Sequence, residues 1–214
     1  DLIRGGSIAA VKGLGGYHLV CDATNEAVVS ELRRRKQRHE KPFAIMFESA
    51  DAAALACVIV PTQRELLTAS SRPIVLLRRL PLARPAVAVG VAPGCPELGV
   101  MLPSTPLHHL LMREAGRPLV MTSGNASDEP IAYDDSDAMA RLGGIAGVFL
   151  THDRAIHIQC DDGVTRVVQG TELPIRRSRG QAPRPVRLPA ACHTPVLAVG
   201  AELKNTFALG RDRA

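Results

Sequence analysis

The stretch KGLGGYHLVCDATNEAVVSELRRRKQRHEKPFAIM, residues 12–46, decides how the fold begins. Its glycine-rich turn at 13–16 lies between two apolar runs, which predicts two strands joined by that turn. Thr24 is then the expected N-cap of an amphipathic helix that ends in the basic residues 33–38. The apolar run at 43–47 predicts a further strand, so strands and a helix alternate within this short segment.

Outward from this segment, the same alternation of apolar runs and helical patterns continues through most of the chain. The expected strands lie at 7–11, 17–21, 43–47, 74–77, 100–102, 119–122 and 148–150, with an edge strand at 87–89 in a proline-rich loop. The expected helices lie after Thr24 and at 49–56, 62–68, 107–114 and 135–142. Strands interleaved with helices indicate an α/β domain built on a sheet.

The composition is that of a folded domain with a mainly aliphatic core. Of 214 residues, 46% are hydrophobic and 22% are charged, which excludes an intrinsically disordered tail. No apolar run approaches the roughly 18 residues that a membrane-spanning helix needs. Because the only aromatic residues are four Phe and two Tyr, the core must be built from aliphatic side chains.

Cysteine usage and the N-terminal sequence favour a cytoplasmic protein. The five cysteines are scattered and form no C-x-x-C pair, which argues against a zinc finger and favours reduced, mostly buried thiols. The first residues carry neither the basic start nor the apolar core of a secretory signal. Because the chain begins without Met and stops just after an apolar run, we expect it to be a piece of a longer polypeptide.

Basic residues concentrate in two places, although the formal net charge is only +5. One cluster spans 33–41 and holds six basic side chains against the single acid Glu40, and the other lies in the acid-free stretch 173–201. The first cluster is either a solvated helix end, where cations complement the macrodipole, or a binding site for a polyanion. Lys36-Gln37-Arg38 and Lys41-Pro42 favour the binding site, because at the ends of helices and strands several donors can reach phosphate oxygens together.

A loop of small polar residues, Thr122-Ser123-Gly124-Asn125, directly follows an apolar strand. It is either an ordinary turn or a nest of backbone N–H groups at a ligand crevice. The glycines at 13–16 do not complete a G-x-G-x-x-G fingerprint, and the chain has no G-x-x-x-x-G-K-[ST] loop. We therefore predict a plain hairpin turn at 13–16.

Acidic and histidine residues form no recognisable metal or catalytic set. Five acidic residues between 128 and 137 could bind a metal, but helix caps near Asp135 explain most of them. These acids are Asp128, Glu129, Asp134, Asp135 and Asp137. The other polar residues that we predict to be structural are His108, His109, His152, His157 and Cys160.

Taken in this order, the basic segment, the small polar loop and a late arginine resemble the YrdC-like family, which includes the threonylcarbamoyl-adenylate synthases. That family carries a K-x-R segment with a following basic residue, then an S-x-N loop, then an arginine near a glycine. The matching residues are Lys36-Gln37-Arg38 with Lys41, Ser123-Gly124-Asn125, and Arg176 to Gly180. The segment at 12–15 is similar to the family's Y-G-L-G, with Lys12 in place of Tyr.

Longer strings resemble the HypF family of carbamoyltransferases, which mature hydrogenases. They cover nearly the whole chain in the correct order, at 12–46, 98–111, 118–135, 149–162, 174–185 and 196–209. Gly163 stands where that family usually has Ser, and Ser104 replaces a common aromatic residue. Both departures concern contacts to the small substrate rather than to phosphate.

The resemblance implies a division of the chain. Residues 1–187 would form the YrdC-like domain, a twisted mixed sheet with flanking helices and a concave basic cleft. Residues 188–195, in the proline-rich stretch 181–195, would be a linker. Residues 196–214 would be the first strands of a truncated carbamoyltransferase domain.

The resemblance also implies an enzyme that joins carbamate to ATP, forms carbamoyl-adenylate and releases pyrophosphate. Carbamoyl phosphate would be the source of the carbamate, and magnesium (Mg²⁺) would accompany ATP. The carbamoyl group would then pass to the C-terminal cysteine of a partner, HypE, in the pathway to the cyanide ligands of nickel–iron hydrogenase. This chemistry implies a cytoplasmic protein without a membrane partner.

The same resemblance assigns roles to individual residues. Lys36, Arg38 and Ser123 would be catalytic, and Asn125 would help Ser123 to hold the α-phosphate and the carbamoyl group. The residues implied to bind ATP or its phosphates are Lys12, Lys36, Arg38, Lys41, Ser123, Asn125, Arg176 and Arg179. Arg176 and Arg179 would close over the nucleotide, and no metal ligand is implied.

Two other classes stay open at this point. One is a module that binds double-stranded RNA or tRNA through the same basic clusters without nucleotide chemistry. Neither cluster has the interleaved aromatic residues that stack on bases, which counts against it. The other is a purely structural docking domain.

Overall fold

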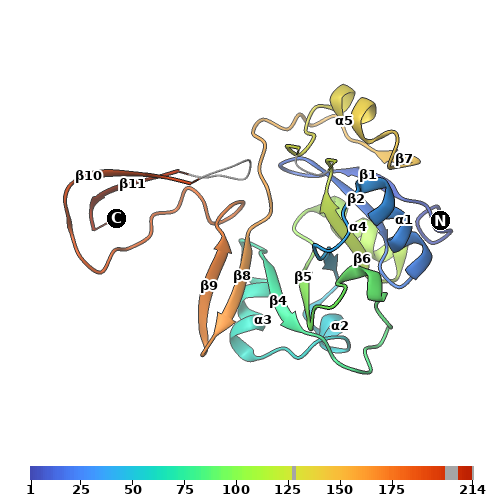
Figure 1. The fold of residues 1–214 in the computed structure, drawn as a ribbon, viewed down its shortest axis with the longest axis horizontal. Coiled ribbons are helices and arrows are strands. Elements are labelled where there is room, and N and C mark those ends of the chain that lie inside the picture. The colour runs from blue at the N-terminus through green and yellow to red at the C-terminus, as the bar shows by residue number, and fades with distance from the viewer. Residues whose placement is uncertain (127–128, 201–206, 214) are drawn as a thin grey trace.

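The main body of the molecule is built on a nine-stranded mixed sheet in the order β7-β1-β2-β6-β3-β5-β4-β8-β9 (Figure 1). The computed structural model describes residues 1–126, 129–200 and 207–213. The strands are β1 (Ala9–Lys12), β2 (Tyr17–Asp22), β3 (Ala44–Met46), β4 (Ile74–Arg78), β5 (Glu97–Met101), β6 (Leu119–Ser123), β7 (Val148–Leu150), β8 (Val164–Val168) and β9 (Thr171–Arg176). The predicted α/β class and the mixed sheet are confirmed.

Helices cover both faces of this sheet. They are α1 (Glu26–Lys36), α2 (Ala50–Ala54), α3 (Pro61–Thr68), α4 (Pro106–Ala115) and α5 (Asp135–Leu142). Side chains alternate between the faces along each strand, so β6 sends Val120 to one buried cluster and Leu119 and Met121 to the other. Residues of α1, α2, α3 and α5 join the Val120 cluster, whereas α4 packs with Met121. Both clusters are mainly aliphatic, as the composition predicted.

Most predicted elements form within a few residues of the expected bounds, and three local predictions are wrong. The segment at 87–89 enters a short 3-10 helix, η1 (Val89–Val91), instead of an edge strand. Asn25, and not Thr24, caps α1, because the Thr24 hydroxyl donates to Asp22 at 2.6 Å. Only Cys21 and Cys57 are buried, so the thiols are not mostly buried.

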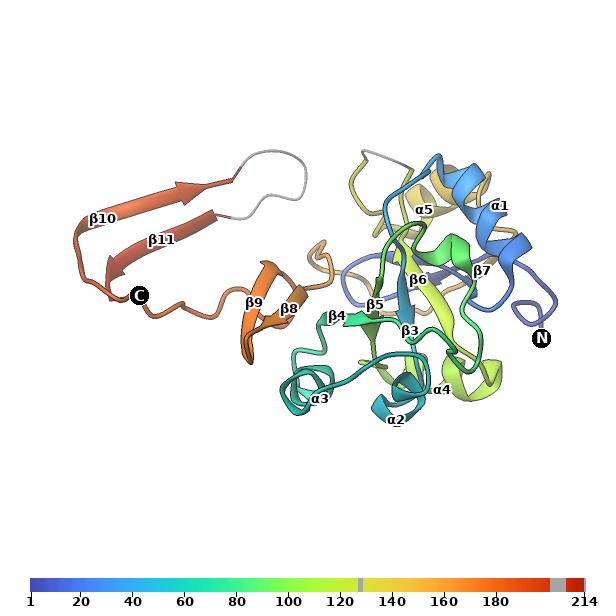
Figure 2. The same ribbon diagram turned by 60° about the horizontal axis from the view of Figure 1, so that its bottom comes forward.

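Strands β8 and β9 were not predicted from the sequence. They form an antiparallel hairpin around Gln169 and Gly170, both of which have positive φ. Polar residues interrupt their apolar pattern, since one edge of this hairpin is exposed and the other pairs with β4. The hairpin extends the sheet on the side of β4 (Figure 2), and it carries Arg176.

The last described segment is a separate two-stranded sheet of β10 (Cys192–Val199) and β11 (Phe207–Asp212). Figures 1 and 2 show this hairpin standing apart from the main body. Strand β10 begins inside the segment 188–195 that was predicted to be a linker. Of the segment 196–214 that was predicted to form strands, residues 201–206 and 214 lie outside the described residues. None of the helices in the described part of the chain is long and apolar enough to cross a bilayer.

Candidate functional site

A pocket with a volume of about 330 Å³ lies on the sheet face that carries α4. Its floor is made of small and apolar residues on four neighbouring strands, among them Ala44, Leu76, Gly99 and Met121. Its rim is polar and, among the described residues, carries four basic and three acidic side chains. The charged and hydroxyl residues of the lining are Arg38, Lys41, Glu97, Thr122, Ser123, Asp161, Asp162, Arg166 and Arg176. Four residues that the sequence marked for phosphate binding therefore meet around one cavity, namely Arg38, Lys41, Ser123 and Arg176.

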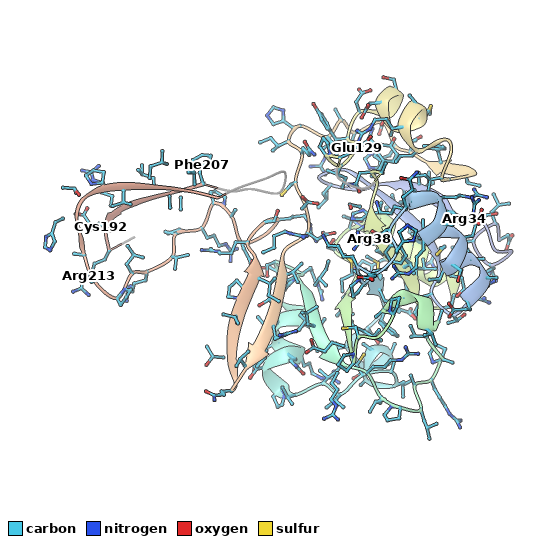
Figure 3. The ribbon with its side chains drawn as sticks, in the orientation of Figure 1. Arg34, Arg38, Glu129, Cys192, Phe207 and Arg213 are labelled. Carbon is cyan, nitrogen blue, oxygen red and sulfur yellow. The ribbon has the colours of Figure 1, made fainter. Side chains whose placement is uncertain are left out.

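Arg38 is the most informative cation of this pocket. Its Nε and Nη2 donate to the carbonyls of Lys41 and Pro42 at 3.1 and 2.6 Å, and its guanidinium lies 5.1 Å from the centre of the Phe43 ring. Figure 3 shows Arg38 in the middle of the main body. Among the described residues, no carboxylate forms an ion pair with it. Burial, together with the charges of Arg33 and Arg176, lowers the pKa of Arg38 to about 10. An anion in the pocket would relieve this crowding of positive charge.

The local chain path holds Arg38 at the rim. Helix α1 ends at Gln37 in the left-handed conformation (φ 54°), and the chain then turns back toward β3. Arg33, which is buried, donates to the carbonyls of Arg38 and His39 at 2.8 and 3.1 Å. Arg34 and Arg35 instead pair with Glu31 on the helix surface. The basic cluster at 33–41 therefore has three parts. Arg34 and Arg35 form ion pairs on the surface, Arg33 is buried against backbone carbonyls, and Arg38 lines the pocket.

The opposite wall of the pocket belongs to the β8–β9 hairpin. Arg166 of β8 pairs with Glu97 of β5, which neutralises both groups. Arg176 at the end of β9 forms no ion pair within the described residues, and its Nη1 is 3.5 Å from the Asp162 carbonyl. Arg38 and Arg176 thus place two positive charges without acidic partners on two sides of one cavity, in the arrangement that polyphosphate binding needs.

Lys36 does not line the pocket but holds one of its loops. The residue is only 1% exposed. Its Nζ donates to the Ser123 carbonyl at 2.7 Å, to Asn125 Oδ1 at 2.8 Å and to the Asn125 carbonyl. Asn125 is also buried, accepts from the Ser123 hydroxyl at 2.7 Å and donates to the Glu129 carbonyl at 2.6 Å. Lys36 and Asn125 therefore fix the loop from beneath and leave Ser123 at the pocket surface.

Gly124 is required by the close approach of this loop to β2. Its N–H donates to the Tyr17 carbonyl at 2.6 Å. A Cβ at position 124 would lie 2.7 Å from that same carbonyl oxygen, a distance that real Cβ contacts do not reach. Backbone packing thus explains why a glycine stands between Ser123 and Asn125.

A buried ionic cluster beside the pocket was missed by the sequence reasoning. Asp162 accepts from His18 Nε2 at 3.0 Å through one carboxylate oxygen and from Arg179 Nη2 at 2.8 Å through the other. Burial would raise the pKa of Asp162, but the hydrogen bonds and charges of His18 and Arg179 outweigh it and hold the pKa well below its usual range. His108 packs edge-on to His18 with ring centres 6.2 Å apart, and burial lowers its pKa to about 3. Arg179, predicted to close over the nucleotide, is therefore committed to Asp162 and is absent from the described pocket lining. The only sequence signal was an acidic residue shortly before the arginine-rich segment.

Lys12 lies elsewhere. It is buried, and its Nζ lies 2.7 Å from Asp135 Oδ1 and 3.0 Å from the His152 carbonyl. The Tyr17 hydroxyl donates to the same carboxylate at 2.7 Å. Lys12 is not among the described residues that line the pocket, so the structure separates it from the other predicted site residues.

The acidic stretch serves mainly as a helix cap and in ion pairs. The Asp134 carboxylate accepts from the N–H groups of Ser136 and Asp137 and caps α5. Glu129 and Asp137 pair with Arg141, and residue 128 lies outside the described residues. Within the described ranges, no group of three or more His, Cys, Asp or Glu side chains is arranged to hold a metal ion.

Comparison with known proteins shows that the chain matches a known family. The Sua5_yciO_yrdC family model, described as telomere recombination, matches residues 1–178. Over 227 residues, 48% are identical to the carbamoyltransferase HypF2 of Cupriavidus necator, an alignment that covers 98% of this chain and 28% of the relative.

Two solved structures agree with this match. A full-length HypF in its phosphate- and nucleotide-bound form superimposes with a TM-score of 0.90 at 43% identity, over 99% of this chain and 33% of that one. The P. abyssi Sua5 complexed with L-threonine shares the fold, with a TM-score of 0.72 at 19% identity over 83% of this chain and 52% of that one. This chain thus spans about a quarter to a third of the HypF proteins that it matches. The chain belongs to the Sua5/YciO/YrdC family, and it is homologous to part of the HypF carbamoyltransferases.

Proposed function

We propose that the pocket binds ATP and catalyses formation of carbamoyl-adenylate from carbamate, with release of pyrophosphate. The observation that carries this proposal is the pair Arg38 and Arg176, two cations without acidic partners that face one cavity with an apolar floor. Such a cavity suits a ligand with a polyanionic end and a flat apolar end, as a nucleoside triphosphate has. The HypF structure that this chain resembles is described as phosphate- and nucleotide-bound, which supports the same ligand class.

In this proposal the triphosphate lies along the basic rim and the base lies on the floor. Arg38 and Arg176 contact phosphate oxygens, and Lys41 on the exposed turn joins them. Ser123 lies at the end of β6 with its hydroxyl at the pocket surface. On binding, this O–H turns from Asn125 Oδ1 toward the α-phosphate or the carbamoyl group. The floor formed by Ala44, Gly99 and Met121 packs against the base.

The chemistry needs charge stabilisation and positioning more than proton transfer. A carbamate oxygen attacks the α-phosphorus, the new P–O bond forms, and the bond to the β-phosphate oxygen breaks, so pyrophosphate leaves with the electron pair. Carbamate is already an anion, so no general base has to activate it. Fixed guanidinium groups stabilise the negative charge that builds on the phosphate oxygens, and the rigid pocket holds the reactants in line.

The family resemblance assigned Lys36 and Arg179 to ATP binding, but in this proposal both residues support the pocket without contacting the ligand. Lys36 shapes the 123–125 loop from below, and Arg179 holds Asp162. Among the pocket carboxylates, Glu97 and Asp162 already face arginines. Mg²⁺ would enter with ATP as a counter-ion of the phosphates, and we name no side chain as its ligand.

The activity of a whole HypF-like protein lies beyond this segment and is proposed by homology alone. In that proposal, carbamoyl phosphate supplies the carbamate, and the adenylate passes its carbamoyl group to the C-terminal cysteine of HypE. The chain spans only about a quarter of such relatives, so these steps require regions outside it.

Calorimetric titration of the 214-residue chain with Mg-ATP tests the proposal. We expect saturable binding that Arg38→Ala and Arg176→Ala each weaken by about tenfold or more, since each charged contact contributes roughly 1.5–3 kcal/mol. Arg34→Ala is the matched control, because Arg34 is exposed on the same basic segment and pairs with Glu31. Addition of carbamate should then release pyrophosphate.

A double-stranded RNA oligomer, titrated in parallel, tests the rival class. Polymer binding through the basic clusters would fall steeply with salt and would weaken in Arg34→Ala as much as in Arg38→Ala. RNA binding of that kind, without heat or thermal stabilisation from Mg-ATP, contradicts the proposed enzyme.

A further inference from the structure

We infer that Asp162 is a positioning residue that sets where Arg176 stands in the pocket, acting through His18 and Arg179. This inference rests on the proposed function, because it assigns a task to Arg176 in binding polyphosphate. It concerns a cluster in which Asp162 lines the pocket, whereas His18 and Arg179 are absent from its described lining. Neither the motifs nor the family resemblance singled out these residues as a group.

Asp162 joins three parts of the chain that are distant in sequence. Its carboxylate accepts from His18 Nε2 of β2 at 3.0 Å and from Nε and Nη2 of Arg179 at 3.1 and 2.8 Å. Its backbone forms an isolated bridge with Arg179, and the Arg179 N–H donates to the Asp161 carbonyl at 3.1 Å. The side chains of His18, Asp162 and Arg179 are only 10%, 13% and 17% exposed.

Arg176 lies directly against this junction. Its Nη1 is 3.5 Å from the Asp162 carbonyl, and it faces Val164 across the β8–β9 pairing. Movement of Asp162 would therefore displace the guanidinium of Arg176. His18, in turn, faces Ser123 across the β2–β6 pairing. The ionic cluster thus connects the strand next to the Ser123 loop with the wall that carries Arg176.

The backbone pairing that attaches this wall to the rest of the sheet is short. Strand β8 pairs with β4 over only two residue pairs, Ile74 with Val164 and Val75 with Thr165. Strand β9 is the last strand of the sheet. The Arg166–Glu97 ion pair and the Asp162 cluster both supplement this short pairing, and of the two the Asp162 cluster lies nearer Arg176.

The chemistry of the cluster favours positioning over general stabilisation. Buried ion pairs recover little more than the cost of desolvating their charges, so they contribute little net stability. Their directional hydrogen bonds do fix the relative geometry of the groups that they join. His18 Nδ1 has no hydrogen-bond partner within the described structure, so Asp162 makes the only hydrogen bond that orients the imidazole there.

A double-mutant cycle on polyphosphate binding tests the inference. Asp162→Asn keeps the size of the side chain and removes its charge. We expect it to weaken Mg-ATP binding by the 214-residue chain about tenfold, and we expect Arg176→Ala to cost about tenfold in the wild type but less than about threefold in the Asp162→Asn background. This loss of additivity reports geometry at Arg176, which a general loss of stability would not produce.

Asp22→Asn is the matched control. Asp22 is also buried, accepts from Arg117 at 2.6 Å and lies on the same strand β2, four residues from His18, or roughly 13 Å along the strand. It does not line the pocket. In the Asp22→Asn background, Arg176→Ala should still weaken binding about tenfold. Arg179→Lys serves as a second, milder perturbation of the cluster if Asp162→Asn does not fold.

Additive effects of Asp162→Asn or Arg179→Lys with Arg176→Ala overturn the inference, and so does an equal loss of additivity with Asp22→Asn. The same cycle with inorganic tripolyphosphate separates this inference from the proposed function. Tripolyphosphate binding with the expected coupling, but without ATP binding, contradicts the nucleotide and keeps the positioning role. A wild-type chain that binds neither ligand contradicts both.

Discussion

Replacement of Lys36 by Met distinguishes a residue that holds the site from one that touches the ligand. Methionine keeps the length of the stem and removes the ammonium group. Lys36 is 1% exposed, and its Nζ lies among the carbonyls of Ser123 and Asn125 and the Asn125 side-chain oxygen. The variant would leave these buried oxygens without their charged donor.

The size of the effect follows from the number and burial of these contacts. A hydrogen bond to a charged group contributes about 1.5–3 kcal/mol, and removal of one partner from a buried charged contact costs about 3–5 kcal/mol. We expect Lys36→Met to lower the free energy of unfolding by about 3–5 kcal/mol. For a domain of this size, each kcal/mol lowers Tm by about 2–4 °C, so Tm should fall by roughly 6–20 °C.

Urea unfolding followed by circular dichroism, together with differential scanning calorimetry, measures this loss. Arg34→Met is the control on the same helix, because Arg34 is exposed and should leave the unfolding midpoint nearly unchanged. Two results together would refute the reasoning: a Lys36→Met chain as stable as the wild type, and complete loss of ATP binding by that chain. Lys36 would then act on the ligand directly, as the family resemblance implies.

Three further predictions concern the loop, the ionic cluster and the second buried lysine. Gly124→Ala should destabilise the fold by about 1–3 kcal/mol, because a Cβ would lie 2.7 Å from the Tyr17 carbonyl oxygen; Gly144→Ala, where a Cβ meets nothing within 4 Å, is its control in the same urea experiment. The folded-state pKa of Asp162 lies below the unfolded value of about 3.9 despite burial, because His18 and Arg179 stabilise its charge; its contribution is therefore present above about pH 4 and lost as the pH falls through the folded pKa. Unfolding free energies at pH 5 and pH 2.5 should differ more in the wild type than in Asp162→Asn, and an equal difference in both would contradict this assignment. Lys12→Met should weaken stability through loss of the Asp135 contact but should leave the affinity for Mg-ATP within about threefold of wild type, since Lys12 lies outside the described pocket lining; a tenfold loss in calorimetry would return it to the binding site.

Prediction from the sequence succeeded where a local pattern is enough to define an element. Helix α5 and strand β7 form at the predicted residues, because a capped amphipathic run and a short apolar run depend only on residues close together in the sequence. Strands β8 and β9 escaped prediction, since a half-exposed edge hairpin has no continuous apolar pattern. The Asp162 cluster was not predicted either, because its three members lie far apart in the chain: on β2, before β8 and after β9.

The sequence alone determined the α/β class, the aliphatic core and the two basic segments. Those properties depend on composition and on residues close together in the chain, which follow the periods of helix and strand. Only the tertiary structure decided the surroundings of the individual cations. Arg38 and Arg176 reach the pocket, whereas Lys36 and Arg179 are held by buried acceptors and Lys12 by Asp135. Charge is a property of a residue type, but its use depends on which oxygen atoms the folded chain places within hydrogen-bond distance.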